Sequence, residues 1–164
     1  GRMVWQKGVY DLFFASLGQP WLMYFAGDGP AKEELETLAM ERGEGNRMIF
    51  LGQLAHSEMA QWYAVADVVA YPSIPTPQWQ EQFGISVIEA AASGCKIVLT
   101  HQNVFEVFAN TISNVFLCPP GDFVGLRETI NRALCTPLQP LGYFRYDSRL
   151  VGERIRKLYG HITY

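Results

Sequence analysis

Short apolar segments alternate with amphipathic ones along this chain, and the alternation restricts its fold more than any other feature. Strands are expected at residues 2–4, 21–26, 48–51, 68–71, 96–100 and 115–118. Most of these segments are apolar throughout, as strands are when both faces of a parallel sheet are covered. The pattern predicts an α/β fold: a Rossmann-like, doubly wound parallel sheet of about six strands with helices on both faces.

The segments between these strands carry the signals of helices. Helices are expected at residues 8–17, 30–42, 85–93, 122–134 and 148–159, with another from Ser57 to residue 65 and a short helical turn at 104–108. Pro30 is typical of the first helical position, and Ser57 and Asp122 are typical of helix caps. Ligands of doubly wound sheets bind beyond the carboxyl ends of the strands, so the residues that follow each strand are the candidates for function.

The stretch EQFGISVIEAAASG, residues 81–94, holds two carboxylates, Glu81 and Glu89, with seven residues between them. A helix is expected to begin after Gly84, and eight helical positions span roughly 12 Å. Carboxylates that far apart cannot share a proton, but they can bind hydroxyl groups at the two ends of an elongated ligand. The free N–H groups at the helix start would bind a phosphate between them. A nucleotide sugar has this layout, although ordinary capping and a solvated glutamate would require the same residues.

Two cations, Arg2 and Lys7, precede the helix that is expected to start at Gly8. Positive charge is unfavourable beside a helix amino terminus, so their presence indicates an anion between them. With a helix amino terminus they could offset a diphosphate without a metal ion, and the chain has no Asp-x-Asp pair to hold one. Two surface cations on a loop are the alternative interpretation.

Glycine turns follow the second and third strands. The sequence GDG at 27–29 resembles part of the dinucleotide-binding fingerprint, but Lys32 occupies the place of the third glycine. Since no acidic residue follows the next strand either, a nicotinamide or flavin cofactor is not expected. Gln53 and Leu54, after Gly52, could present backbone groups to a planar base; a simple turn from strand to helix is the alternative.

Composition argues against several classes of protein. With 164 residues, 49% of them hydrophobic, the chain is large enough for one domain with its own core. A net charge of −3 argues against general nucleic-acid binding, and no apolar run approaches the ~20 residues that span a bilayer. The three cysteines lack a CxxC spacing and the three histidines are isolated, so neither a metal site nor a disulfide framework is expected. Cys95, Cys118 and Cys135 are expected to be buried as small hydrophobic residues in a reducing compartment, which indicates a cytoplasmic protein.

Six pieces of the chain, taken in order, resemble one known family. They are GRMVWQKG at residues 1–8, YFAGDGP at 24–30, IFLGQL at 49–54, YAVADVVAYPS at 63–73, EQFGISVIEAAASG at 81–94 and CPPGD at 118–122. Together they are similar to the carboxyl-terminal, donor-binding domain of the retaining glycosyltransferases of the GT-B fold, family 4, also described as glycosyl transferases group 1. The resemblance implies one half of a GT-B fold that binds a nucleotide-diphosphate sugar.

The resemblance also implies roles for individual residues. Arg2 and Lys7 would hold the donor diphosphate, the backbone at Gly84, Ile85 and Ser86 would meet the phosphates and the sugar, Glu89 would bind the ribose hydroxyls, and Gln53 and Leu54 would line the base site. Glu81 would contact hydroxyls of the transferred sugar near the reacting face, and it is the best candidate for a catalytic residue. In such enzymes the sugar is transferred with retention of configuration and without a metal ion or cofactor.

A second domain is implied as well. In such enzymes the acceptor site lies largely on a separate amino-terminal domain, so residues 1–164 are expected to be a single donor-binding domain of a longer enzyme. Because transfer requires both reactants to be held in line, the isolated domain is expected to bind a donor but to transfer little or no sugar. Association of the full-length enzyme with a membrane is left open.

One loop departs from the family pattern. Many relatives have a Gly-Gly pair after the fifth strand, whereas this chain has THQN at residues 100–103. Donor contacts from that loop are therefore not carried over to this chain.

Two other functions stand as alternatives to a transferase. One is a non-catalytic module that binds a nucleotide sugar, and the other is a nucleotide-sugar epimerase of the same architecture. The joint presence of two cations and two carboxylates at the expected positions favours the transferase, because a scaffold has no need of all four.

Overall fold

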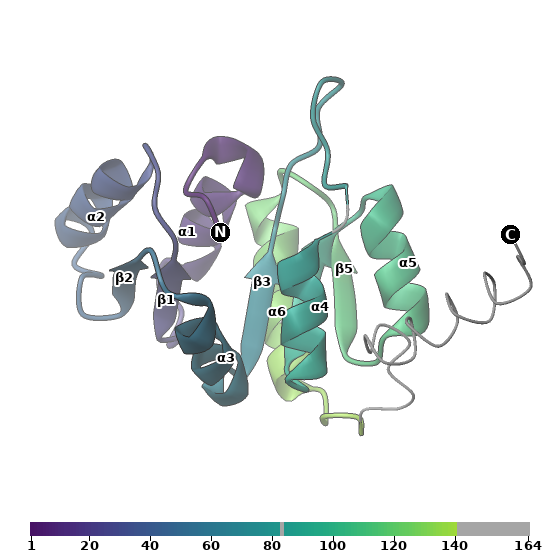
Figure 1. The fold of residues 1–164 in the computed structure, drawn as a ribbon. Coiled ribbons are helices and arrows are strands. Elements are labelled where there is room, and N and C mark those ends of the chain that lie inside the picture. The colour runs from purple at the N-terminus through teal and green to yellow at the C-terminus, as the bar shows by residue number, and fades with distance from the viewer. Residues whose placement is uncertain (83, 141–164) are drawn as a thin grey trace, which may run out of the picture.

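The structure is a computed structural model that describes residues 1–82 and 84–140. Its strands are β1 (Met23–Ala26), β2 (Met48–Gly52), β3 (Val68–Tyr71), β4 (Lys96–Thr100) and β5 (Val115–Cys118). Its helices are the short 3₁₀ helix η1 (Trp5–Lys7), α1 (Val9–Ser16), α2 (Lys32–Glu41), α3 (His56–Val65), α4 (Ile85–Ala92), α5 (Asn103–Thr111) and α6 (Phe123–Cys135). Figure 1 shows their arrangement.

All strand pairs in the described residues are parallel. β1 pairs with β2, and β3, β4 and β5 form a three-stranded sheet with β4 in the middle. Each connection between paired strands contains a helix, as parallel pairing requires. The predicted α/β fold with parallel strands is confirmed.

Helices cover both faces of the three-stranded sheet (Figure 1). On one face, Ile97 and Leu99 of β4 pack against buried residues of α3, α4 and α5. On the other face, Val98 packs against buried residues of α6 and α1. Neighbouring residues of a strand point to opposite faces, so the apolar residues of β4 are buried only because both faces are covered.

The strand expected at residues 2–4 is not formed, so the described residues contain five strands and not six. The amino group of Gly1 donates to the carbonyl of Ala26, and the Met3 N–H donates to the carbonyl of Asp28 at 2.7 Å. These bonds join the segment to the end of β1 and to the turn after it. They do not run along β1 as the bonds between paired strands do, so no strand forms. The edges of β1 and β3 therefore stay unjoined, and both line an apolar cavity of about 700 Å³.

Two boundaries near β1 also differ from the prediction. β1 begins at Met23 and not at residue 21, because Met23 lies opposite Met48, the first residue of β2, and earlier residues have no partner strand there. α2 begins at Lys32, with Ala31 as its cap residue, so Pro30 precedes the helix instead of opening it. The shift has little structural consequence, because proline is compatible with the turn that leads into a helix.

α3 and α5 also differ from the helices that the sequence predicts. α3 begins at His56, so Ser57 lies inside the helix and does not cap it. The cap residue is Ala55, and its N–H donates to the Glu58 carboxylate at 2.6 Å. The helical turn expected at 104–108 is a full helix, α5, because its apolar face continues to Ile112.

The predicted cap of α6 is confirmed. The Asp122 side chain accepts from the N–H groups of Val124 and Gly125 at 3.1 and 2.9 Å.

The helix expected at 148–159 lies outside the described residues. Within residues 1–82 and 84–140, no helix has the length and apolarity needed to cross a membrane.

The three cysteines differ in accessibility, which leads to a first prediction. Cys95 and Cys118 are buried, and burial raises the pKa of both thiols to about 11. Cys135, expected to be buried, is exposed at the end of α6. Because only a thiolate reacts with iodoacetamide, the native chain at pH 8 is expected to take up one label, at Cys135, and the urea-unfolded chain three. Mass spectrometry of the labelled peptides measures this, and rapid native labelling of Cys95 would contradict the described packing.

Candidate functional site

A cavity of about 990 Å³ lies at the carboxyl ends of β3 and β4, the edge at which doubly wound sheets bind ligands. Its walls come from the segment before α1, the loop between β3 and α4, and the first residues of α4 and α5. Seven of the nine residues predicted from the sequence line it: Arg2, Lys7, Glu81, Gly84, Ile85, Ser86 and Glu89. The structure thus brings together groups that are far apart in the sequence.

Lys7 lies beside Glu81 although 74 positions separate them in the chain. The carbonyl of Gln6 accepts from the Ile74 N–H at 2.8 Å, so η1 lies against the first residues of the loop between β3 and α4. This contact places the last residue of η1 next to the last part of the loop. The Lys7 ammonium and the Glu81 carboxylate form an ion pair there.

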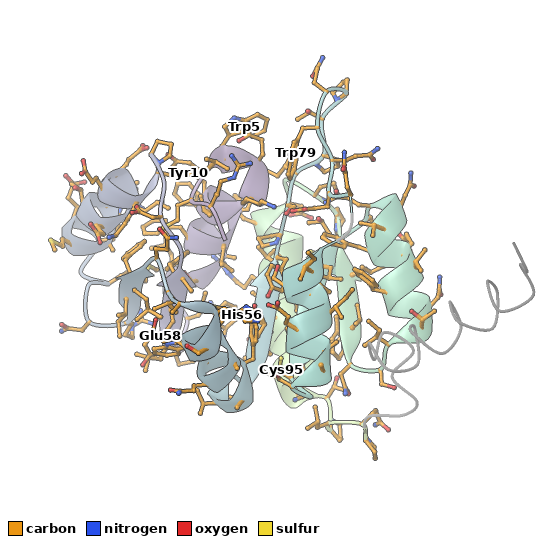
Figure 2. All side chains as sticks on the ribbon, viewed as in Figure 1. Trp5, Tyr10, His56, Glu58, Trp79 and Cys95 are labelled. Atoms are coloured by element: carbon orange, nitrogen blue, oxygen red, sulfur yellow. The ribbon has the colours of Figure 1, made fainter. Side chains whose placement is uncertain are left out.

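The ammonium of Lys7 has a second neighbour in the same loop. It lies 5.1 Å from the centre of the Trp79 ring, a distance at which a cation is attracted to the ring face. Figure 2 shows Trp79 in the loop that extends beyond β3. The Lys7 side chain is still 26% exposed, and Arg2, which lines the same cavity, is exposed. Both cations are therefore accessible to an anion in the cavity.

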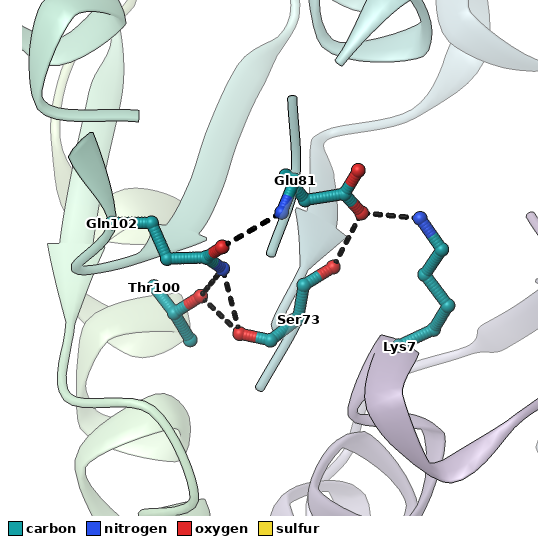
Figure 3. Close-up of polar contacts among 5 residues, drawn as sticks. All are labelled: Lys7, Ser73, Glu81, Thr100 and Gln102. Atoms are coloured by element: carbon teal, nitrogen blue, oxygen red, sulfur yellow. Dashed lines mark hydrogen bonds and ion pairs between the residues drawn. The ribbon is translucent and has the colours of Figure 1, made fainter. Parts of the chain in front are cut away.

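Glu81 is held at both its carboxylate and its backbone (Figure 3). The Ser73 hydroxyl donates to Oε1 of Glu81 at 2.9 Å, and the Lys7 ammonium contacts the same oxygen. The Glu81 N–H donates to Oε1 of Gln102 at 3.2 Å. The side chain of Glu81 is only 15% exposed, so its carboxylate has a fixed position beside the cavity.

The first turn of α4 also faces the cavity. Gly84, the cap residue, has φ 68°, a conformation that glycine adopts without strain. The hydroxyl of Tyr71, whose pKa is raised by burial, donates to the carbonyl of Ser86 at 3.0 Å and ties this turn to the end of β3. The first N–H groups of a helix have no partner within the helix, so this turn offers donors and a positive dipole end to a ligand.

Glu89 lies further along α4. Its side chain is 30% exposed, and its Oε1 lies 3.6 Å from Nδ1 of His56, the first residue of α3, which Figure 2 labels. Gln53 and Leu54 do not line the cavity. They follow β2 and precede His56 by three and two residues, respectively, so they lie in the segment that leads to the histidine beside Glu89.

The sequence matches one protein family over most of its length. The family described as "Glycosyl transferases group 1" matches residues 1–136. The chain belongs to this family. Its helix-covered parallel strands match one half of a GT-B enzyme, as the sequence resemblance implied.

Individual proteins of known sequence or structure resemble the chain at 22–26% identity. A 2-deoxystreptamine glucosyltransferase of Streptomyces kanamyceticus is 26% identical over 152 residues, which cover 88% of this chain and 38% of that protein. The sucrose-phosphate synthase of Thermosynechococcus elongatus has a TM-score of 0.75 at 25% identity, covering 99% of this chain and 45% of its own. Anabaena HepE, solved in complex with UDP, has a TM-score of 0.78 at 22% identity, with coverage of 99% and 47%. The chain spans less than half the length of each.

Two residues that hold Glu81 in place were not identified from the sequence. Ser73 is 1% exposed and Gln102 is 7% exposed, and both contact Glu81. Each lies two residues beyond the end of a strand, Ser73 after β3 and Gln102 after β4. Their position just after a strand could have indicated a role in the site. Neighbouring residues that only form the turn share that position, so it did not distinguish Ser73 and Gln102 from them.

The site offers charge and hydrogen bonds. Within residues 1–82 and 84–140, no cluster of three or more His, Cys, Asp or Glu side chains could hold a metal ion. The cavity instead combines two cations, a helix amino terminus and two carboxylates. Cations and helix N–H groups bind phosphate oxygens, and carboxylates accept hydrogen bonds from hydroxyl groups.

Proposed function

We propose that this chain is the donor-binding domain of a retaining, metal-independent glycosyltransferase that moves a sugar from a nucleotide-diphosphate sugar to an acceptor. One observation carries the proposal: a single cavity is lined by Arg2, Lys7, the first turn of α4 and both carboxylates of the 81–94 stretch. An isolated helix terminus or glutamate would be unremarkable. Their convergence on one cavity in a member of a glycosyltransferase family supports a donor site.

The proposed arrangement of the donor follows the order of groups along the cavity. The diphosphate lies between Arg2, Lys7 and the N–H groups at the start of α4, where two positive charges offset its negative charge. Glu89 accepts from the ribose hydroxyls, and Glu81 accepts from hydroxyls of the transferred sugar. Gln53 and Leu54 contact the base.

The ion pair between Lys7 and Glu81 gives donor binding a specific consequence. Without a donor, the two charges neutralise each other. When a diphosphate binds, its oxygens compete for the Lys7 ammonium, because phosphate carries more charge than a carboxylate. Glu81 keeps its bond from Ser73 and gains a free lone pair for a sugar hydroxyl.

The nucleotide and the acceptor are proposed from relatives. UDP is the first nucleotide to test, because Anabaena HepE was solved with UDP. The acceptor site is proposed to lie on another domain, since the glucosyltransferase of Streptomyces kanamyceticus is matched over 38% of its length. Residues 1–164 alone are therefore expected to bind donor and to transfer little or no sugar.

Calorimetric titration of the folded chain with UDP, GDP, ADP and their glucose conjugates, in EDTA, tests this proposal. Saturable binding of UDP and UDP-glucose is expected. Glu89→Ala should weaken binding on the order of tenfold, because hydrogen bonds from the ribose to a charged acceptor are lost. Glu128→Ala, which removes an exposed glutamate from α6 outside the cavity, is the matched control and should leave binding unchanged.

Three outcomes would contradict parts of the proposal. A folded chain that binds none of these nucleotides would argue against a donor site. Binding that requires added magnesium would argue against metal independence. Equal effects of Glu89→Ala and Glu128→Ala would remove Glu89 from the site.

A further inference from the structure

Gln102 occupies the cap position before α5, yet its side chain does not cap that helix. The side chain is buried, with the residue 7% exposed, and it turns toward the loop between β3 and α4 (Figure 3). A buried amide must find partners for its polar atoms, so its hydrogen bonds indicate what fixes its position.

The hydrogen bonds of the Gln102 amide determine its orientation. Nε2 donates to the carbonyl of Ser73 at 2.9 Å and to the hydroxyl oxygen of Thr100 at 3.0 Å, and Oε1 accepts from the Glu81 N–H at 3.2 Å. A reversed amide would set its oxygen against the Ser73 carbonyl and its NH₂ group against the Glu81 N–H. Both contacts would be repulsive, so only one orientation satisfies the neighbours.

Gln102 reaches Glu81 by two routes. It binds the Glu81 backbone directly, and it binds the carbonyl of Ser73, whose hydroxyl donates to the Glu81 carboxylate at 2.9 Å. The Thr100 hydroxyl donates to the same Ser73 carbonyl. The ends of β3 and β4 and the residue proposed to contact the sugar therefore share one buried network.

The loop that carries Glu81 has little regular structure of its own. Between β3 and α4 the described residues form one isolated bridge, between Thr76 and Trp79. The backbone of such a loop is positioned by side chains from neighbouring elements. Gln102 supplies that support at Glu81 itself.

We propose that Gln102 is a positioning residue that sets the place of the Glu81 carboxylate and thereby the affinity for the sugar part of the donor. The inference rests on the proposed donor site. Gln102 acts through Glu81 and Ser73 and is not among the residues that line the cavity. Its loss should therefore affect the recognition of the sugar and leave the recognition of the nucleotide intact.

Amide hydrogen exchange of Glu81, followed by NMR, tests the positioning without any ligand. Gln102→Leu removes all three hydrogen bonds at similar volume, and the protection of the Glu81 amide is expected to fall on the order of tenfold. Gln102→Glu keeps an acceptor for the Glu81 N–H but loses both donors, so an intermediate loss is expected. His101→Ala is the matched control, because His101 is the exposed neighbour in the same loop and its ring contacts Glu106.

Titration then tests the consequence for the donor. The ratio of the affinities for a UDP-sugar and for UDP is measured with UDP-glucose, UDP-galactose and UDP-N-acetylglucosamine. Gln102→Leu is expected to lower the ratio for the preferred sugar on the order of tenfold while UDP binds as it does to the unchanged chain. A role in general stability would lower both affinities together or neither.

The outcomes separate this inference from the proposed function. Unchanged exchange of the Glu81 amide in Gln102→Leu would overturn the inference, and so would equal losses of UDP and UDP-sugar affinity. An unchanged chain that binds no nucleotide would overturn the proposed function, with the exchange measurement still deciding whether Gln102 positions Glu81.

Discussion

Replacing Lys7 with alanine is expected to weaken the binding of UDP on the order of 100-fold. Lys7 lines the cavity, and its ammonium lies beside the Glu81 carboxylate while its side chain stays 26% exposed. A hydrogen bond to a charged group contributes about 1.5–3 kcal/mol, and its removal leaves Glu81 without the cation that neutralises it. A diphosphate entering the variant would meet an unpaired carboxylate as well as one cation fewer, so both effects weaken binding.

The salt dependence of binding gives a second measure of the same substitution. Added salt screens charges and should weaken the binding of UDP to the unchanged chain. The variant, with one attractive contact removed, should depend less on salt between 50 and 300 mM sodium chloride. Calorimetric titrations at the two concentrations give both the affinity and its salt dependence.

Lys96→Ala is the matched control for this experiment. Lys96 begins β4, and its ammonium donates to the carbonyl of Leu134 at 3.2 Å. It lies at the opposite end of the strand from the cavity, so its removal changes the net charge equally without touching the site. If Lys96→Ala and Lys7→Ala weaken UDP binding alike, net charge and not the proposed contact accounts for the effect.

The strands were predicted best where an apolar segment is bounded by residues that end a strand. The bounds of β3, β4 and β5 match the predicted residues, because each has a short apolar core and Pro72 ends the first of them. The strand expected at residues 2–4 failed for a different reason. A strand exists only when its backbone pairs along its length, and the sequence of one segment does not say which partner lies beside it.

The site was predicted in outline and missed in its connections. Reading the residues at the carboxyl ends of the strands works for the loop that carries Glu81, because parallel strands bring these ends to one edge. Lys7 was grouped with Glu81 through the family resemblance, although the strand expected before Lys7 is not formed. Their ion pair joins residues 74 positions apart and depends on how η1 lies against the loop. The side chain of Gln102 could equally have capped α5. It instead bonds to the carbonyl of Ser73 and the N–H of Glu81, which lie far from it in the sequence.

Gly8→Ala is expected to destabilise the chain by about 3 kcal/mol, because two costs add there. Gly8 has φ 65°, and an L-residue with that conformation costs roughly 1–2 kcal/mol. A methyl group on Gly8 would also overlap the carbonyl of Pro72, just after β3, and moving packed backbone costs roughly 1–3 kcal/mol more. Urea unfolding followed by circular dichroism measures the loss.

Gly18→Ala separates the two costs. Gly18 has φ 69°, close to that of Gly8, but an added methyl group would have no neighbour within 4 Å. This control should lose only the conformational part, roughly 1–2 kcal/mol. Equal losses in the two variants would contradict the close approach of Gly8 to Pro72.

The close approach also connects stability with the site. Gly8 follows Lys7, and Pro72 precedes Ser73, so any shift that relieves the overlap moves one contact of Glu81 away from the other. Gly8→Ala should therefore weaken UDP-sugar binding even under conditions in which the chain remains folded, whereas Gly18→Ala should not. A folded Gly8→Ala variant with unchanged donor affinity would show that the position of η1 against β3 is not what brings Lys7 to its place.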